Sequence, residues 1–139
     1  MDVFEIDSMN LSLPFPPSVN GYWRSPNRGK LAGRHLVSER GRKYRAEAVA
    51  EIIEQLRGMP QPVKGDLAVS VTLCPPSRAK RDLDNYFKAL FDSVTNAGIW
   101  IDDSQIKKLE AKWGPVTKGG RVYLSIVETP QNLISVRVR

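Results

Sequence analysis

The sequence has few of the side chains that build sulfur or imidazole sites. Cys74 is the only cysteine and His35 the only histidine among 139 residues. A single cysteine excludes an intramolecular disulfide and a cysteine-rich zinc site, and a single histidine excludes a site of paired histidines. No apolar run approaches the roughly 20 residues of a membrane span. Residues 1–10 carry three acids and no base, unlike a secretory leader. We therefore expect a cytoplasmic protein.

Positive charge is present in excess and is unevenly distributed. The net charge is +6 at pH 7. Residues 24–45 contain one acid, Glu39, and eight bases: Arg24, Arg28, Lys30, Arg34, Arg40, Arg42, Lys43 and Arg45. A phosphate backbone is the obvious partner for such a stretch. An ordinary solvated surface explains an isolated run of charge about equally well.

The pattern of apolar residues predicts a single domain over residues 1–139. Residues 67–73, 109–113 and 122–126 alternate as strands do, and 11–15 and 34–37 are shorter strand candidates. A hairpin-type turn at 117–120 separates the last two long strands. Residues 18–33 form a loop, and residues 133–139 form a further strand, an oligomer arm or a disordered tail.

Two helices complete this pattern. Ser38 is a suitable N-cap for a helix over residues 38–57, whose apolar residues recur every four positions. A second helix begins at Asp82 or Leu83, buries a stripe of 3.6-residue period and ends at Gly98. The order is β-β-α-β-α-β-β. It predicts an α+β domain of two layers, with both helices packed on one face of a mixed sheet.

Acidic residues cluster around the second helix of this basic chain. Asp82 and Asp84 lie at its start with Lys88 one turn further, and Asp102 and Asp103 follow its end. Taken singly, Asp82 is a helix cap and Asp84 with Lys88 an ordinary helix pair. Taken together, they suggest a divalent-metal site, because a metal ion lets an acidic pocket hold a phosphodiester.

Chain length is compatible with convergence of the two acidic groups. From Asp84 to Ala97 a helix rises about 20 Å. An extended chain from Gly98 to Asp103 returns at most about 20 Å. If it doubles back along the helix, Asp103 arrives near Asp84. Two or three carboxylates then suit one or two Mg²⁺ ions, and Lys88 is placed to stabilise transition-state charge.

Longer motifs resemble those of the RusA family of Holliday junction resolvases. The resemblance covers about residues 11–128, in the same order and at compatible spacing. It rests on residues 13–20, 37–38, 81–85 with Lys88, 91–92, 97–105 and 115–121. The ends of the chain, residues 1–10 and 129–139, lie outside it.

The resemblance implies a small homodimeric endonuclease that depends on Mg²⁺, for which Mn²⁺ can substitute. Such enzymes are often carried by prophages and nick two opposing strands of a four-way junction in DNA recombination and repair. The family's catalytic, metal-binding aspartates match Asp82, Asp84 and Asp103, and its essential lysine matches Lys88. Asn85 and Asp102 are candidates for supporting roles. No small-molecule cofactor is implied.

We expect the DNA contacts to come from the basic stretch and from bases beside the acids, namely Arg24, Arg28, Lys30, Arg34, Arg40, Arg42, Lys43, Arg78, Lys80, Arg81 and Lys118. Tyr22 and Trp23 either stack on unpaired bases or pack the loop onto the domain, while Trp100 and Trp113 are expected in the core or an interface. Besides a nuclease, the sequence is also compatible with a non-catalytic protein that binds branched DNA. A small-substrate phosphotransferase is disfavoured by the absence of a Gly-rich nucleotide loop.

Overall fold

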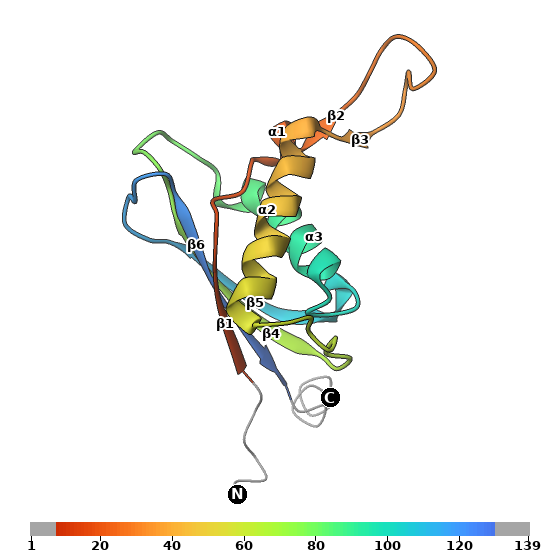
Figure 1. The fold of residues 1–139 in the computed structure, drawn as a ribbon. Helices are drawn as coiled ribbons and strands as arrows, with labels where there is room; N and C mark the ends of the chain where they lie inside the picture. Colours follow the sequence, from red (N-terminus) through yellow and green to blue (C-terminus); the bar gives the residue numbers. More distant parts are fainter. Residues whose placement is uncertain (1–7, 130–139) are drawn as a thin grey trace, which may run out of the picture.

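The computed structural model describes residues 8–129, which form a mixed four-stranded sheet with two main helices on one face (Figure 1). This is the α+β arrangement predicted from the sequence. The elements are β1 Ser8–Leu13, α1 Val19–Tyr22, β2 Trp23–Arg24, β3 Leu36–Val37, α2 Glu39–Leu56, β4 Leu67–Cys74, the 3₁₀ turn η1 Leu83–Tyr86, α3 Phe87–Ala97, the 3₁₀ turn η2 Asp103–Gln105, β5 Ile106–Trp113 and β6 Arg121–Glu128. Residues 133–139, where a further strand or tail was considered, lie outside the described part.

Helix α2 forms where its cap and apolar stripe predicted it. The Ser38 hydroxyl oxygen accepts a hydrogen bond of 2.9 Å from the Gly41 backbone N–H. Along the helix, Tyr44, Ala48 and Ile52 are buried. Ile52 packs with the sheet residues of the main core, whereas Tyr44 and Ala48 form a smaller cluster with Tyr22 and Ala89. The stripe therefore fixes α2 against the sheet and also against the start of α3.

The second helix begins later than the sequence indicated. Residues 83–86 form the 3₁₀ turn η1, and regular α-helix starts only at Phe87. Leu90 and Val94 of α3 are fully buried, and Gly98 closes the helix in the left-handed conformation with φ 85°. Because Asp84 lies in the 3₁₀ turn, it does not share a regular α-helical face with Lys88.

The sheet has the strand order β1-β6-β4-β5, with β4 and β5 parallel and the other pairs antiparallel. The turn at residues 117–120 forms, since the Gly120 N–H donates to the Thr117 carbonyl at 2.8 Å. It is not a hairpin between neighbours, because β4 lies between β5 and β6. After β5 the chain crosses the end of β4, where the Gly114 N–H donates to the Leu73 carbonyl at 2.8 Å. Alternation predicted these strands but not their partners.

A long arm leaves the body of the molecule beside the start of α2 (Figure 1). Its base is the antiparallel pair β2 and β3, with Trp23 opposite Val37 and Arg24 opposite Leu36. We call residues 24–35 the basic arm. Gly29 and Gly33 turn its backbone with φ of 80° and 81°, a conformation that favours glycine. The segment expected as a loop at 18–33 thus also contains α1 and β2.

Candidate functional site

Two of the predicted acids share one hollow beside the sheet. Asp82 and Asp84 are exposed and line a depression with Phe87 and the β5 residues Leu109 and Ala111. The hollow exists because the chain leaves β4, passes over its end and starts η1 next to β5. The two carboxylates are therefore carried by a turn that is packed against the core on one side and open to water on the other.

Neither carboxylate has the ordinary role that its sequence position suggested. Asp82 precedes η1 but makes no capping hydrogen bond with its side chain. The ion pairs found within residues 8–129 include neither Asp82 nor Asp84. Within the described residues, neither acid therefore has the capping or pairing role that would explain it, and their role as metal ligands stays a prediction.

The second acidic pair divides into two different environments. The Asp102 carboxylate caps η2, accepting from the Ser104 N–H at 3.2 Å, and Gln105 completes a capping box. Hydrogen bonds from the Ser104 side chain and then its backbone lower the pKa of Asp102. Asp103 is half-buried and has no such capping role. Asp102 therefore has a structural role as the cap of η2. The predicted ligand Asp103 has no such role.

The structure does not gather all three predicted ligands into one cage. Turn η2, which carries Asp103, contacts α3, so the chain does return to the helix after Gly98. Within residues 8–129, however, no group of three or more His, Cys, Asp or Glu side chains is arranged to hold a metal ion. Asp82 and Asp84 share their hollow, and Asp103 is not among the residues that line it.

Lys88 has partners other than the one that the sequence suggested. Its ammonium nitrogen lies 3.2 Å from Asp92 Oδ1, one turn along α3. It also lies 5.8 Å from the centre of the Trp23 ring, at the base of the basic arm. The expected pair with Asp84 is absent among the described residues, because η1 is a 3₁₀ turn. The Lys88 side chain is still 45% exposed, so a ligand can reach its ammonium group.

A hydrogen-bonded chain fixes the partner of Lys88. The Tyr22 hydroxyl donates to Asp92 Oδ2 at 2.8 Å, and Arg45 Nη2 donates to the Tyr22 hydroxyl oxygen at 2.8 Å. Burial raises the pKa of Tyr22, with Arg45 opposing and Asp92 adding to the rise. The phenol is therefore protonated at neutral pH and acts as a donor to Asp92. Tyr22 is fully buried, so the packing role prevails over base stacking for this residue.

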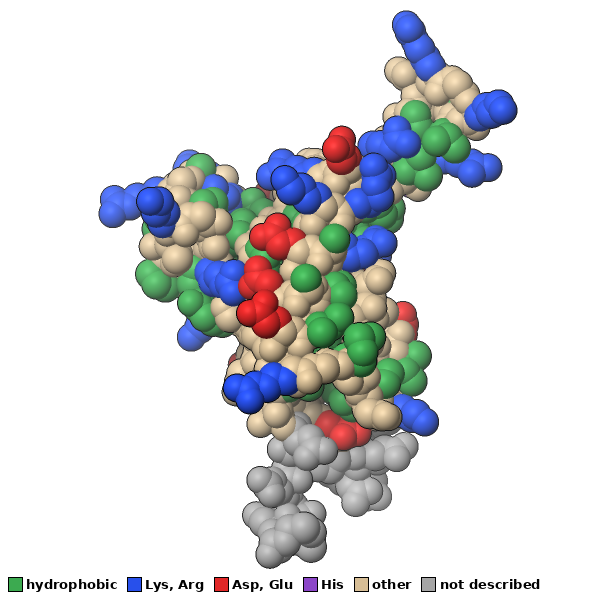
Figure 2. Space-filling view, viewed as in Figure 1, with side chains coloured by type: hydrophobic (Ala, Val, Ile, Leu, Met, Phe, Trp, Pro, Cys, Tyr) green, Lys and Arg blue, Asp and Glu red, His purple; other side chains and the backbone are tan. Residues whose placement is uncertain are grey.

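The predicted DNA contacts lie mainly on the basic arm and the first turns of α2. Figure 2 shows Lys and Arg side chains along the arm and around the upper end of α2. The exposed members of this group are Arg24, Arg28, Lys30, Arg34, Arg40, Arg42 and Lys43. Arg42 also donates to the Val37 carbonyl at 2.8 Å, which ties it to the base of the arm. The arm itself carries no acid.

A second basic group lies on the loops at the end of the sheet, and one of its members, Arg81, lines the acidic hollow. Arg78, Lys80 and Lys118 are exposed on the loops at the end of the sheet. Arg81 differs from them, because its guanidinium donates to the Ser77 and Ala79 carbonyls at 2.9 and 3.0 Å. These bonds give the loop its shape. Asn85, a candidate for a supporting role, lines a hollow together with Asp82 and Lys80.

Sequence reasoning missed Asp92, Tyr22 and Arg45 as the support of Lys88. One signal was present, since Lys88 and Asp92 are four residues apart in a helix and such pairs face each other. No comparable signal connects Tyr22 with Asp92, because 70 residues separate them. Their contact depends on how α1 packs against α3.

Comparison with known proteins identifies related chains. The family model described as "Endodeoxyribonuclease RusA" matches residues 14–127. A protein of Escherichia coli (strain K12) named "Crossover junction endodeoxyribonuclease RusA" is 42% identical over 126 residues, covering 88% of this chain and 97% of the relative. Similarly named relatives from Enterobacteria phage 82 and Shigella sonnei (strain Ss046) are 41% and 40% identical with the same coverage. None of the helices in residues 8–129 is long and apolar enough to cross a membrane.

Proposed function

Because this chain belongs to the RusA family of endodeoxyribonucleases, we propose that it is a Holliday junction resolvase that nicks opposing strands of four-way DNA. The observation that carries the proposal is the pair of carboxylates, Asp82 and Asp84, which share one hollow of a protein with net charge +6 and form no ion pair within residues 8–129. An acidic hollow suits a polyanion only when a cation sits between the two.

The donor chemistry of the hollow fits Mg²⁺. Magnesium prefers hard oxygen ligands and is commonly held by one or two carboxylates together with waters and substrate phosphate oxygens. Asp82 and Asp84 would supply those carboxylates, and Asp103 would join them in the complex with DNA. When bound, Mg²⁺ polarises the phosphoryl oxygens and lowers the pKa of a coordinated water. Mn²⁺ offers a similar preference for oxygen ligands and substitutes for it.

Lys88 acts on the charge that develops during phosphodiester cleavage. Its ammonium is exposed and is held by Asp92, which in turn accepts from Tyr22. A positive group already in place stabilises negative charge on the phosphoryl or leaving oxygen without reorganising at the moment of reaction. Asp92 therefore acts as a positioning residue for Lys88. Asn85 lies beside Asp82 and would orient a water or a phosphate oxygen.

Substrate binding comes from the bases around the site. The exposed bases of the basic arm and of the start of α2 bind phosphates, and so do the exposed Arg78, Lys80 and Lys118 on the loops at the end of the sheet. Recognition then depends mostly on the shape and deformability of the junction, because phosphate contacts carry no sequence information. The relatives are bacterial and phage proteins, which fits action on chromosomal or prophage DNA in the cytoplasm.

A homodimer suits this substrate. A four-way junction has approximate two-fold symmetry, and resolution needs two coordinated cuts. Two copies of this chain related by a two-fold axis would present two equivalent acidic hollows. Each copy would then contribute its own basic arm to the opposite side of the junction.

A nicking assay tests the proposal directly. Synthetic four-way junction, linear duplex and single strand are incubated with the protein, with and without Mg²⁺. The expected result is paired nicks in the junction alone, only when Mg²⁺ is present. Junction binding without nicking at any Mg²⁺ or Mn²⁺ concentration would instead identify a non-catalytic branched-DNA-binding protein.

A further inference from the structure

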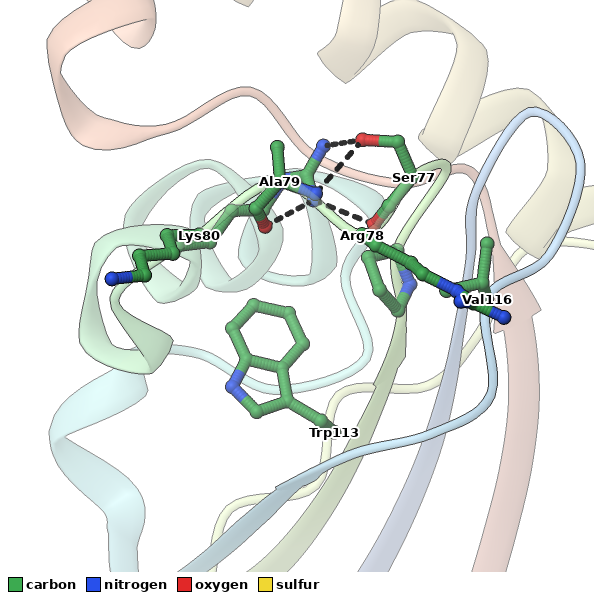
Figure 3. A pocket seen from close by; sticks show the side chains of 8 residues that line it. Ser77, Arg78, Ala79, Lys80, Trp113 and Val116 are labelled. Carbon is green, nitrogen blue, oxygen red and sulfur yellow. Dashed lines mark hydrogen bonds between the residues drawn. The ribbon is translucent and has the colours of Figure 1, made fainter.

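A second hollow, which the reaction proposed above does not use, lies beside the acidic one. It has a volume of about 260 Å³ and lies between the loop after β4 and the end of β5 (Figure 3). Its lining includes Pro75, Arg78, Lys80, Arg81, Trp113 and Val116. The combination is unusual in that a large aromatic ring and an aliphatic side chain lie among three bases, with no acid in the lining.

Trp113 offers a flat apolar surface at this hollow. The sequence predicted Trp113 in the core or an interface, but it is 37% exposed, whereas Trp100 is 1% exposed. The Trp113 ring is supported from inside by Tyr86, with ring centres 5.9 Å apart in an edge-on arrangement. Tyr86 in turn packs on Phe15 at 5.1 Å. The indole is thus held in place by the core while part of it stays open to the solvent.

The opposite wall is shaped before any ligand arrives. Arg81 donates to the Ser77 carbonyl, the Ala79 carbonyl and the Ser77 hydroxyl at 2.9, 3.0 and 3.0 Å, and Figure 3 shows these bonds closing the loop. With Arg81 engaged in this way, Arg78 and Lys80 are the exposed cations at the rim. A preformed slot with an aromatic floor and a cationic rim suits a planar apolar group attached to an anion.

The position of the slot defines which planar group it meets. The slot shares Arg81 with the acidic hollow, and Trp113 follows Ala111, which lines that hollow, by two residues on β5. A nucleotide whose phosphate lies at the acidic hollow would therefore have its own base, or that of its neighbour, beside the slot. In a paired duplex that base is stacked and inaccessible, whereas bases at the centre of a branch point can leave the stack.

We propose that the Trp113 slot binds an unpaired nucleobase next to the phosphate that is cut. Stacking on the indole, with phosphate contacts from Arg78 and Lys80, adds affinity for junctions over continuous duplex and sets a preference for the base at that position. The inference rests on the proposed function for the location of the cut, but binding of an unpaired base can be measured without cleavage. The charged rim favours nucleic acid over a second copy of this chain as the occupant.

The experiment uses four-way junctions that carry a fluorescent purine analogue at single positions around the branch point, without divalent metal so that no strand is cut. With the unaltered protein, we expect quenching at one position next to the nick site and none in the duplex arms. With Trp113→Leu we expect that quenching to disappear and junction affinity to fall by roughly tenfold, the scale of one base stacked on an aromatic ring. Trp113→Phe retains an aromatic ring and should keep most of both signals.

Tyr123→Leu is the matched control, because Tyr123 is an exposed aromatic, 51% accessible, that does not line the slot. It should leave quenching and affinity unchanged. Uniform or absent quenching with the unaltered protein would overturn the proposal, whether or not the variants fold. A change of oligomeric state in Trp113→Leu, measured by sedimentation, would assign the ring to a protein interface and also overturn it. If the unaltered protein shows position-specific quenching but does not nick the junction when Mg²⁺ is added, the nuclease function is rejected and base binding by the slot is not.

Discussion

The acidic hollow and the basic arm show opposite ways of placing charge. Asp82 and Asp84 are separated by one residue, and Tyr86, two residues after Asp84, is buried, so the core holds their backbone in place. The arm extends from two short strands, and its residues 27–35 are all exposed. A reaction that needs ligands within fractions of an ångström requires the first arrangement, whereas attraction to a phosphate backbone tolerates the second. Changes in the hollow should therefore abolish cleavage, and changes in the arm should weaken binding.

Among the variants, Asp84→Asn should separate cleavage from junction binding most strongly. Losing one carboxylate of the hollow weakens metal binding and reduces cleavage by on the order of a thousandfold, the scale for removing a group that stabilises transition-state charge. Junction affinity should stay the same or rise, because a charge that repels phosphate is removed. Single-turnover nicking and gel-shift titration measure the two quantities. Glu110→Gln, on the neighbouring strand outside the hollow, is the control and should retain cleavage.

A comparison of Asp103→Ala with Asp102→Ala sharpens the assignment of adjacent acids. Asp103→Ala should lose cleavage with little change in melting temperature, since Asp103 has no capping role. Asp102→Ala should lower the melting temperature and keep most of the cleavage, because the Asp102 side chain caps η2 and alanine has no acceptor to replace it. Nicking rates and thermal melts on the same preparations test both. The reverse pattern would move the ligand role from Asp103 to Asp102.

Asp92→Asn should lower turnover by about tenfold to a hundredfold, the cost of misplacing a reacting group. Substrate affinity should hardly change, because Asp92 contacts Lys88 rather than the outer basic surface. In a Lys88→Ala background the same substitution should add nothing, since the group that Asp92 positions is gone. Steady-state rates on the four proteins give this comparison. Additive losses would contradict the positioning role.

Tyr22→Phe removes the hydroxyl that donates to Asp92, the partner of Lys88, and so tests the next hydrogen bond of the same chain. It should reduce turnover less than Asp92→Asn, since Lys88 keeps its direct partner. Tyr44→Phe is its matched control, because the Tyr44 hydroxyl donates to the Pro14 carbonyl at 2.8 Å, in the same cluster but away from Lys88. Both variants lose one hydroxyl and about 1 kcal/mol of stability. A change in turnover is expected only for Tyr22→Phe.

Removal of two charges from the arm should act on binding alone. Arg28→Ala combined with Lys30→Ala should weaken junction affinity several-fold and reduce the slope of log affinity against log salt by about 2, one unit for each phosphate that the arm no longer neutralises. Turnover at saturating junction should be unchanged. Lys64→Ala, an exposed lysine outside the arm, is the control. An unchanged salt slope in the double variant would show that the arm does not touch DNA.

Sequence reasoning succeeded where the controlling interactions are local. The cap at Ser38 and the four-residue repeat predicted α2, and Gly98 predicted the end of α3. The strand partners could not be predicted, because the pairing of β6 between β1 and β4 joins residues that are far apart in the chain. In the site, the residue types predicted Asp82 and Asp84 as metal ligands, and the structure adds that they share one hollow. Their freedom from capping and pairing, and the support of Lys88 by Asp92, depended on a 3₁₀ turn and on tertiary packing that no local pattern records.

The strand order also has a consequence for synthesis of the protein. Among residues 8–129, the pairing partner of β1 is β6, so that Leu11 meets Leu124 and Leu13 meets Val122. The sheet therefore cannot close until β6 has been synthesised, and contacts of such long sequence separation form slowly. The acidic hollow lies beside β5, a strand of that same sheet. A nascent chain that still lacks β6 would thus carry the acids and the basic arm without an assembled sheet, and activity would begin only after β6 has paired.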